Sequence, residues 1–296
     1  MPDDYSSCCA PGATCRSRYI AVNEGVSLQV TTFTPPQLSP YPEIVFIPGW
    51  ISLVAGWRNA LIEMSRDFVI HYVETREKLS ARTDSTARFG IDDFASDITA
   101  IVKALQLAAG AYILCGSSLG ATAIIESYRM LPLKPRCLIL IGVNARFYIP
   151  RFWRAVVFCF PPRLYLIIKP VVKWYLRTFR LDTHSDPLQY EKYCRNLETA
   201  DPWKLRKSAL AFARYTVWEQ LPAIDRPTLL FSGSRDALHE LDNIRRIGAL
   251  LPHSTHIDLE TNSAMHDAVM VNEVRRYLTQ SAAGEAADQT TTNDPS

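Results

Sequence analysis

The sequence predicts an α/β fold in which a mostly parallel sheet is covered by helices on both faces. Short uncharged apolar runs alternate with longer segments whose apolar residues recur at helical spacing. This alternation is typical of parallel strands, because joining two of them requires a crossover long enough to hold a helix. The alternation stops over residues 146–222 and resumes at residue 227. We therefore expect one sheet-and-helix domain that carries an insertion.

The predicted elements follow one another in a regular order. The chain begins with a hairpin, whose arms at 18–22 and 28–34 meet at Asn23-Glu24-Gly25. The later strands are expected at Glu43–Ile47, Phe68–Val73, Ala111–Cys115, Cys137–Ile141, Pro227–Phe231 and His256–Leu259. The helices are expected at Ala55–Arg66, Ile91–Leu107, Ala121–Met130, Leu238–Leu251 and Ala268–Gln280.

Composition indicates a globular protein with a sizeable core. The chain has 296 residues, of which 48% are hydrophobic and 21% charged. Its net charge of +2 gives no indication of a nucleic-acid partner. The acidic N-terminus has no apolar signal segment behind it, and no apolar run reaches the about 18 residues that a membrane-spanning helix needs. We expect a cytoplasmic protein and leave peripheral membrane contact open.

Both ends of the chain are expected to lack regular structure. Residues 1–17 show no periodicity and are predicted to be a flexible tail, and residues 281–296 are small and polar and are predicted to be disordered. The seven cysteines are scattered, as is usual for free thiols in the cytosol. Cys8, Cys9 and Cys15 cluster without a nearby histidine, so a metal site there would lack a fourth ligand. Acylation of Cys8 or Cys9 is left open. No cofactor or metal is expected.

The stretch Gly116-Ser117-Ser118-Leu119-Gly120 is the most informative motif. It follows an apolar strand and precedes a helix-favouring segment. This context is the one that a nucleophile elbow requires, in which a sharp turn presents the serine hydroxyl at the end of the sheet. Glycines on both sides avoid collisions between the strand and the helix. The motif predicts Ser118 as a nucleophile, although a plain Gly-Ser turn would give the same pattern.

Two further residues follow predicted strands. Asp236 comes shortly after the strand ending at Phe231, and His266 lies in the loop that opens the last helix. Residues beyond the carboxyl ends of parallel strands converge on one crevice, so Ser118, Asp236 and His266 are predicted to meet. A serine needs a base, which imidazole supplies, and a carboxylate fixes the imidazole tautomer. The structural alternatives are a helix cap for Asp236 and an exposed helix-start position for His266.

These motifs resemble those of α/β-hydrolase-fold serine hydrolases of the esterase and lipase type. The resemblance covers residues 18–145 and 223–280, with residues 146–222 as a helical cap. It implies Ser118 as nucleophile, His266 as general base and acid, and Asp236 as the orienting carboxylate. It also implies an oxyanion hole made by the backbone N–H groups of Trp50 and Leu119.

The sequence departs from that family at two loops. Pro48-Gly49 stands where the family often has His-Gly. After the strand ending at Val73, the family often has Asp-x-Arg-Gly-x-Gly, whereas this chain has Glu74-Thr75-Arg76-Glu77-Lys78-Leu79. The loss of these glycines is expected to change the loop near the site, and neither departure involves the triad.

The first half of the insertion is basic and aromatic. Residues 146–180 contain eight basic residues and no acidic one. Lys169, Lys173, Arg177 and Arg180 are expected to share one face of a helix, opposite an apolar face. Three interpretations remain: a cap with a solvated basic face, a cap that lies on an anionic membrane, and, least favoured, a nucleic-acid site.

The expected activity is hydrolysis of a carboxylic ester or thioester with an apolar acyl group, through an acyl-enzyme. The partner would then be a small apolar ester or thioester. A thioesterase or acyltransferase with the same triad is the nearest alternative. A protein of this fold that binds lipid or membrane without turnover is the alternative from a different class.

Overall fold

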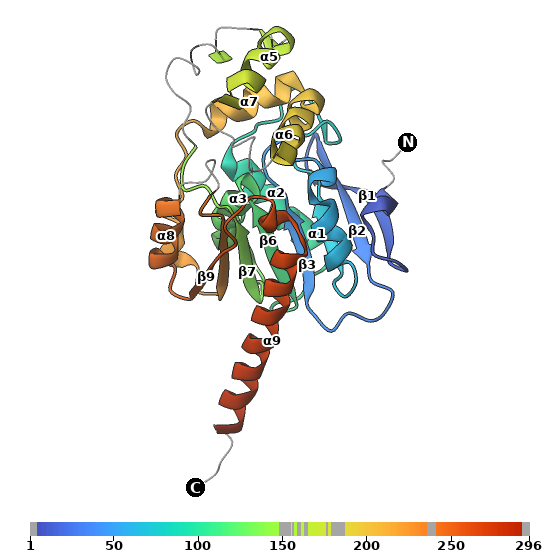
Figure 1. Ribbon diagram of the computed structural model, residues 1–296, viewed down its shortest axis with the longest axis vertical. Helices are drawn as coiled ribbons and strands as arrows, with labels where there is room; N and C mark the ends of the chain where they lie inside the picture. Colours follow the sequence, from blue (N-terminus) through green and yellow to red (C-terminus); the bar gives the residue numbers. More distant parts are fainter. Residues whose placement is uncertain are drawn as a thin grey trace.

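The central sheet has the strand order β1-β2-β4-β3-β6-β7-β8-β9, with the short β5 paired to β2. The computed structural model describes residues 5–147, 155, 157–158, 161–162, 165–175, 177–178, 187–235 and 241–291. The strands are β1 (Thr14–Asn23), β2 (Val26–Thr34), β3 (Glu43–Ile47), β4 (Ile70–Val73), β5 (Arg82–Thr83), β6 (Tyr112–Ser117), β7 (Cys137–Ile141), β8 (Thr228–Ser232) and β9 (Ser254–Asp258). Strand β2 pairs antiparallel with β1, β4 and β5. The strands β4, β3, β6, β7, β8 and β9 run parallel to one another (Figure 1).

The central strands are buried on both faces, which explains their unbroken apolar sequences. In β6, Tyr112 and Leu114 point into one core and Ile113 and Cys115 into the other. The same alternation holds along β3 and β7. Successive side chains of a strand point to opposite faces, so a strand covered on both sides has no polar positions. The mostly parallel sheet predicted from the sequence is confirmed.

Helices cover both faces of the sheet. Apolar residues of α2 (Ile91–Ala104), α3 (Leu119–Ser127) and α8 (Leu241–Leu250) belong to one core. Those of α1 (Arg58–Met64) and α9 (Ala268–Thr291) belong to the other. Short 3₁₀ turns complete the connections. They are η1 (Tyr5–Cys8), η2 (Val54–Trp57), η3 (Tyr128–Met130), η6 (Leu221–Ala223) and η7 (Ala264–His266).

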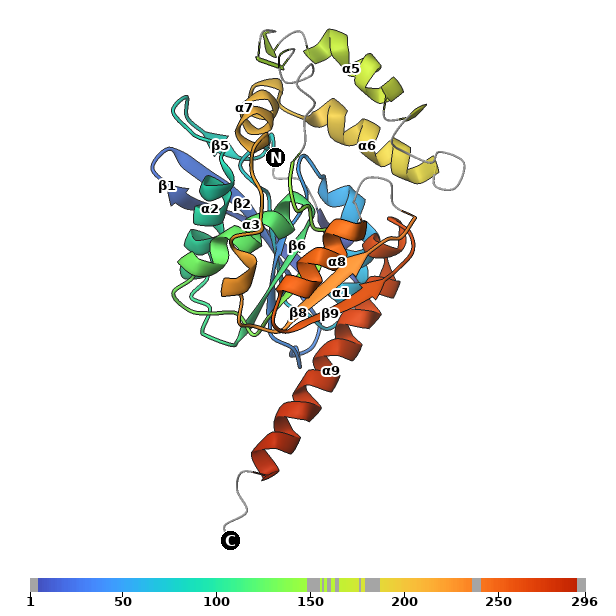
Figure 2. The ribbon, with the colours of Figure 1, turned by 90° about the vertical axis from the view of Figure 1, so that its left-hand side faces the viewer.

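Both ends of the described chain contain more structure than the sequence pattern suggested. Tyr5 and Cys8 are buried in the core beside α1, and β1 already begins at Thr14. The segment before Thr14 is too short to show a period, and the buried side chains of residues 5–13 are those of Tyr5, Cys8 and Ala10. At the other end, α9 continues to Thr291 instead of ending near Gln280, and its last turns project away from the domain (Figures 1 and 2). The alanine-rich composition of 282–287 favours helix without supplying an apolar stripe.

Three helices described within residues 146–222 lie beyond the carboxyl ends of the strands (Figure 2), and we refer to them as the cap: α5 (Tyr165–Tyr175), α6 (Pro187–Thr199) and α7 (Pro202–Phe212). Asp201 caps α7 by accepting hydrogen bonds from the N–H groups of Trp203 and Lys204. The Lys204 ammonium also donates to the carbonyls of Lys78 and Ala81, at 2.8 and 2.6 Å. These bonds fasten α7 to the loop that follows β4.

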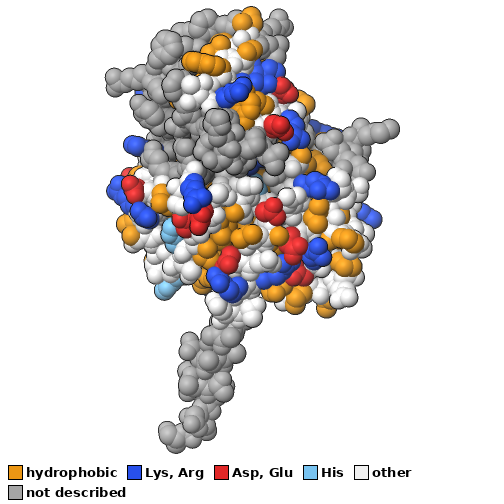
Figure 3. All heavy atoms as spheres, viewed as in Figure 1, with side chains coloured by type: hydrophobic (Ala, Val, Ile, Leu, Met, Phe, Trp, Pro, Cys, Tyr) orange, Lys and Arg blue, Asp and Glu red, His pale blue; other side chains and the backbone are white. Residues whose placement is uncertain are grey.

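The basic face predicted for residues 169–180 is partly neutralised within the cap. Lys173 pairs with Glu198 of α6, and Arg177 lies over the Tyr190 ring, whereas Arg180 lies outside the described residues. On the face seen in Figure 3, basic side chains of the cap accordingly lie beside acidic ones. Apolar side chains of α5 are exposed to solvent instead of packing on the core, namely Ile167, Val171 and Trp174. Peripheral membrane contact through residues 146–180 stays a prediction.

None of the described helices is long and apolar enough to cross a bilayer.

The six cysteines in the described part of the chain, among them Cys8, Cys9 and Cys15, are free thiols. Burial raises the pKa of Cys115 far above its usual range. In the same residues, no group of three or more His, Cys, Asp or Glu side chains is arranged to hold a metal ion.

A buried ion pair joins the loop after β4 to α2. The Arg76 side chain is 1% exposed and forms two hydrogen bonds with the Asp97 carboxylate, at 2.7 and 2.5 Å. It also donates to the carbonyls of Arg88 and Asp93. Removal of the guanidinium would leave the buried Asp97 carboxylate without this partner, so this arginine fixes the course of the loop from Glu74 to Gly90.

Arg76→Met is expected to lower the free energy of unfolding by about 3–5 kcal/mol, because it leaves the Asp97 carboxylate buried without its partner. Chemical denaturation monitored by circular dichroism measures this change. The control is the double variant Arg76→Met/Asp97→Leu, which removes both charges and is expected to be more stable than the single variant. A single variant as stable as the parent would contradict a structural role for the pair.

Candidate active site

Ser118 occupies a sharp turn between β6 and α3. Its backbone has φ 50° and ψ −113°, a left-handed conformation that residues other than glycine rarely adopt. Such a conformation costs about 1–3 kcal/mol and persists only where the surroundings enforce it. Here the Ser118 N–H donates to the carbonyl of Ile141 at 2.9 Å, which ties the turn to the end of β7. The hydroxyl is therefore presented at the carboxyl edge of the sheet.

The two glycines of the motif allow this turn to pack tightly. A Cβ atom on Gly120 would lie 2.0 Å from the Ile47 carbonyl oxygen, and one on Gly116 would lie 2.7 Å from the carbonyl carbon of Gly120. Both distances are far below van der Waals contact, and the atoms involved belong to the backbone. Any side chain at these positions would separate α3 from β3 and β6.

Asn144, in the loop after β7, contacts the proposed nucleophile directly. Its Nδ2 donates a hydrogen bond of 2.8 Å to Ser118 Oγ. The Thr122 hydroxyl lies within hydrogen-bond distance of the carbonyls of both Ser118 and Asn144, at 3.1 and 3.0 Å. The elbow and the loop after β7 thus form one hydrogen-bonded unit, and Asn144 fixes the direction in which the Ser118 oxygen points.

The loop after β3 lies beside the serine. A Cβ on Gly49 would be 3.4 Å from Ser118 Cβ, so a larger residue would crowd the nucleophile. Trp50 follows, and its indole N–H donates to Ser208 of α7 at 3.0 Å. The Leu119 N–H is at the first position of α3, where an α-helix provides no internal acceptor. The structure thus places the N–H groups of Trp50 and Leu119 on segments adjacent to Ser118.

A buried glutamate supports the loop that carries Trp50. Ile51 also has a positive φ, 51°, which is unusual for a β-branched residue. Its N–H donates to Glu77 Oε1 at 3.0 Å, and the Thr75 hydroxyl donates to the same oxygen at 3.0 Å. Glu77 is fully buried, and this burial raises the pKa of its carboxyl group. Glu77 thereby holds the strained residue that follows Trp50.

His266 ends η7, just before α9. Its ring packs on Trp57, with the ring centroids 4.0 Å apart. Nδ1 lies 2.8 Å from the Asn262 carbonyl oxygen, and Nε2 lies 3.1 Å from the ammonium of Lys192 on α6. An ammonium can only donate and a carbonyl can only accept, so the ring carries its proton on Nδ1. Nε2 keeps its lone pair, as a general base requires.

Among the described residues, the predicted triad can be followed only at Ser118 and His266. The hydrogen bonds of the Ser118 hydroxyl and the His266 ring run to Asn144, Asn262 and Lys192, and no hydrogen bond links Ser118 to His266. Asp236 lies outside the described residues. His266 lines a cavity of about 340 Å³ between η2, α6 and the start of α9, together with Lys192 and Asn196.

Three residues of the site were missed from the sequence. Asn144 could have been found, because it follows a parallel strand next to the elbow strand, as Asp236 and His266 follow theirs. Glu77 stands where the sequence departs from the family pattern, but nothing in the sequence shows that it reaches Ile51. Lys192 lies 74 residues from His266 in a cap helix, and no local pattern indicates that contact.

Solved structures share this architecture, although no family profile and no curated protein sequence matches the chain. A thermophilic esterase from Thermogutta terrifontis superimposes with a TM-score of 0.72 at 18% identity, covering 90% of this chain and 98% of that one. An esterase from Rhodococcus sp. gives 0.69 at 16% identity, covering 89% and 98%. An enol-lactonase from Burkholderia xenovorans gives 0.68 at 18% identity, covering 90% and 98%.

These structures superimpose on nearly the whole chain. Because the sequence identities are only 16–18%, the superpositions establish similarity of fold alone. The fold is also the one that the sequence motifs implied. Three features agree with this fold: the mostly parallel sheet, the serine turn after β6 and the helical segment beyond the strand ends. The chain therefore has the α/β-hydrolase fold.

Proposed function

We propose that the protein is a serine hydrolase that cleaves a carboxylic ester with an apolar acyl group. The observation that carries this proposal is the conformation of Ser118, a strained residue at the carboxyl edge of the sheet, beside the two residues proposed as backbone donors, Trp50 and Leu119. Backbone strain of this kind is retained where it has a use. The esterases and the enol-lactonase of the same fold act on ester bonds according to their names, which supports the same class of reaction here.

In the proposed mechanism, the Ser118 oxygen attacks the ester carbonyl while His266 Nε2 accepts its proton. The N–H groups of Trp50 and Leu119 stabilise the negative charge that develops on the carbonyl oxygen. The imidazolium then protonates the leaving alcohol, and water releases the acid from the acyl-enzyme by the same steps. Asp236 is proposed as the carboxylate that orients His266. The reaction requires His266 Nε2 to exchange the Lys192 ammonium for the Ser118 hydroxyl.

An apolar acyl group suits the aromatic surroundings of the elbow. Phe212 of α7 packs against Trp50 and Phe147, with ring centroids 6.0 and 5.2 Å apart. Trp50 belongs to the loop beside Ser118, so this aromatic cluster connects the cap to the site. An acyl chain that enters beside these rings would exchange water for apolar contacts. Thioester cleavage and acyl transfer by the same residues are the alternatives within this proposal.

A fluorophosphonate probe is expected to label the protein, and Ser118→Ala is expected to abolish labelling and to lower kcat/KM for p-nitrophenyl esters at least about 10³-fold. Ser117→Ala is the matched control, since Ser117 is the buried neighbour in the same motif and should leave labelling intact. Acyl-thioesters and esters of increasing acyl length, assayed in parallel, define the substrate class. A folded protein that neither reacts with the probe nor turns over any ester would instead be a binding protein.

Glu77→Ala is expected to lower kcat about tenfold or more with little change in KM, because the loop that carries the Trp50 N–H loses its support. Glu77→Gln keeps an oxygen for the Ile51 N–H and should retain most of the activity. Thr75→Val removes only the second hydrogen bond to the same carboxylate oxygen and serves as the control. Steady-state kinetics with one ester measure all three. Loss of stability in Glu77→Ala with an unchanged kcat would contradict the positioning role.

A further inference from the structure

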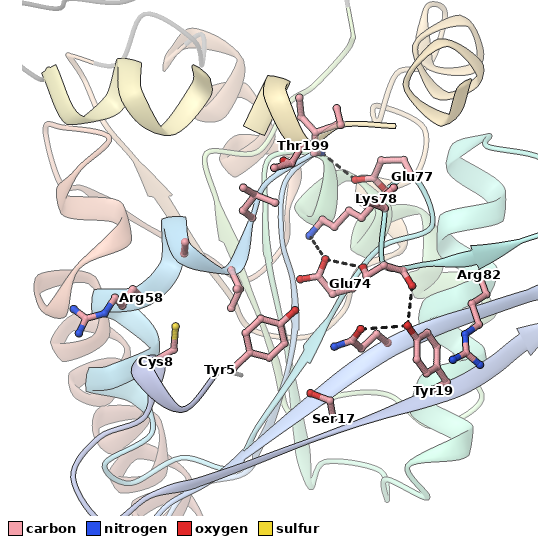
Figure 4. A pocket seen from close by; sticks show the side chains of 18 of the residues that line it. Tyr5, Cys8, Ser17, Tyr19, Arg58, Glu74, Glu77, Lys78, Arg82 and Thr199 are labelled. Carbon is pink, nitrogen blue, oxygen red and sulfur yellow. Dashed lines mark hydrogen bonds and ion pairs between the residues drawn. The ribbon is translucent and has the colours of Figure 1, made fainter. Parts of the chain in front are cut away.

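A large cavity lies beside the proposed active site. Its volume is about 1010 Å³, and its walls come from η1, β1, β2, η2, the segment after β4 and the end of α6 (Figure 4). The described residues that line it do not include Ser118, Leu119 or His266. Its wall includes Ile51 and Glu77, which support the loop of Trp50, and it shares Leu53, Ala55 and Arg58 with the cavity that His266 lines. A ligand bound here would be a second molecule, separate from the ester at Ser118.

Unpaired polar atoms gather at this cavity. Four buried side-chain atoms in the described residues have no hydrogen-bond partner, namely Gln29 Nε2, Tyr72 Oη, Glu77 Oε2 and Lys78 Nζ. Gln29, Glu77 and Lys78 line the cavity, and each is less than a tenth exposed. The Tyr72 ring lies 5.5 Å from the Lys78 ammonium, so its hydroxyl belongs to the same group. Leaving a buried polar atom unpaired costs about 1–3 kcal/mol, and such atoms rarely cluster without a partner to bind.

The balance of donors and charges favours an anion. Three of the four unpaired atoms are hydrogen-bond donors, in Gln29, Tyr72 and Lys78. Four basic side chains line the cavity against two acidic ones. The basic ones are Arg18, Arg58, Lys78 and Arg82, and the acidic ones are Glu74 and Glu77.

The two carboxylates leave room for that anion. Glu74 is already engaged, since its Oε2 accepts from Ser80 at 3.2 Å and lies 3.6 Å from Lys78 Nζ. Glu77 is engaged as well, since its Oε1 accepts hydrogen bonds from Ile51 and Thr75, and burial raises its pKa. In Figure 4, the Lys78 side chain extends toward Glu74 across the cavity.

Part of the remaining wall is apolar. Tyr5, Leu53, Val54 and Leu79 contribute rings and aliphatic side chains to it. The cavity therefore combines a cationic, donor-rich floor with apolar sides, a combination that fits an anionic group attached to a small hydrocarbon body.

We propose that this cavity binds a small organic carboxylate, whose oxygens accept hydrogen bonds from Lys78 and Gln29 and whose hydrocarbon part packs against Tyr5 and Leu53. The carboxylate satisfies the unpaired donors, and the hydrocarbon part displaces water from the apolar wall. The binding does not depend on catalysis at Ser118.

The test is isothermal titration calorimetry of the full chain with benzoate, benzamide and phenyl phosphate, three probes with one aromatic body. Saturable binding of benzoate with a 1:1 stoichiometry is expected, and benzamide should bind at least about tenfold more weakly because it is uncharged. Phenyl phosphate distinguishes a carboxylate site from a general anion site. Tighter binding of phenyl phosphate than of benzoate would overturn the choice of carboxylate.

Lys78→Met keeps the length of the side chain and removes its charge, so it should weaken benzoate binding about tenfold or more. Lys134→Met is the matched control, because Lys134 also lies over a tyrosine ring, that of Tyr128, but does not line the cavity. Ser118→Ala should bind benzoate as the parent does, even if the proposed hydrolase activity proves wrong. Absence of saturable benzoate binding, equal losses in both lysine variants, or a loss in Ser118→Ala would each overturn the proposal.

Discussion

The close contact between the first turn of α3 and the end of β3 is the constraint on which the site depends. Gly120 lies against the Ile47 carbonyl so tightly that no side chain fits between them. This contact sets the distance from the elbow to the loop of Gly49 and Trp50, and hence the distance between the nucleophile and one of its two proposed backbone donors. Helix α3 is buried along most of its length, so it cannot shift to relieve a misfit at the turn.

Much of the fold could be predicted from the sequence, because strands buried on both faces appear in it as short, uncharged apolar runs. Cys137–Ile141 is uncharged and apolar throughout, and it forms β7 with those bounds. Segments whose structure depends on a few long-range contacts show no such pattern in the sequence. Tyr5 and Cys8 pack into the core from a segment too short to show a period. The end of α9 follows from local helix propensity, which apolar periodicity does not report.

The site was predictable to the extent that chain order and strand ends determine it. Ser118 has the turn geometry expected of the elbow, and His266 lies in the loop before α9. Of the partners that hold these two side chains, Asn144 follows a neighbouring parallel strand and could have been found in the same way, whereas Lys192 contacts His266 from a helix 74 residues away and could not. The hydroxyl and the imidazole therefore rest on different parts of the molecule. Ser118 is held by the core, whereas His266 is held by Asn262 and Trp57 of the core and by Lys192 of the cap.

The backbone of Ser118 adopts a conformation that the isolated turn would avoid, and three strands enforce it. β6 leads into the turn, β7 accepts its N–H at Ile141, and β3 presses on Gly120. An unfolded or partly folded chain contains the same serine without this geometry. If Ser118 is the nucleophile proposed above, the reactivity of its hydroxyl group reports whether the middle of the sheet has assembled. Covalent modification at this position would count native molecules in a mixed population, and it would do so without a spectroscopic signal from the backbone.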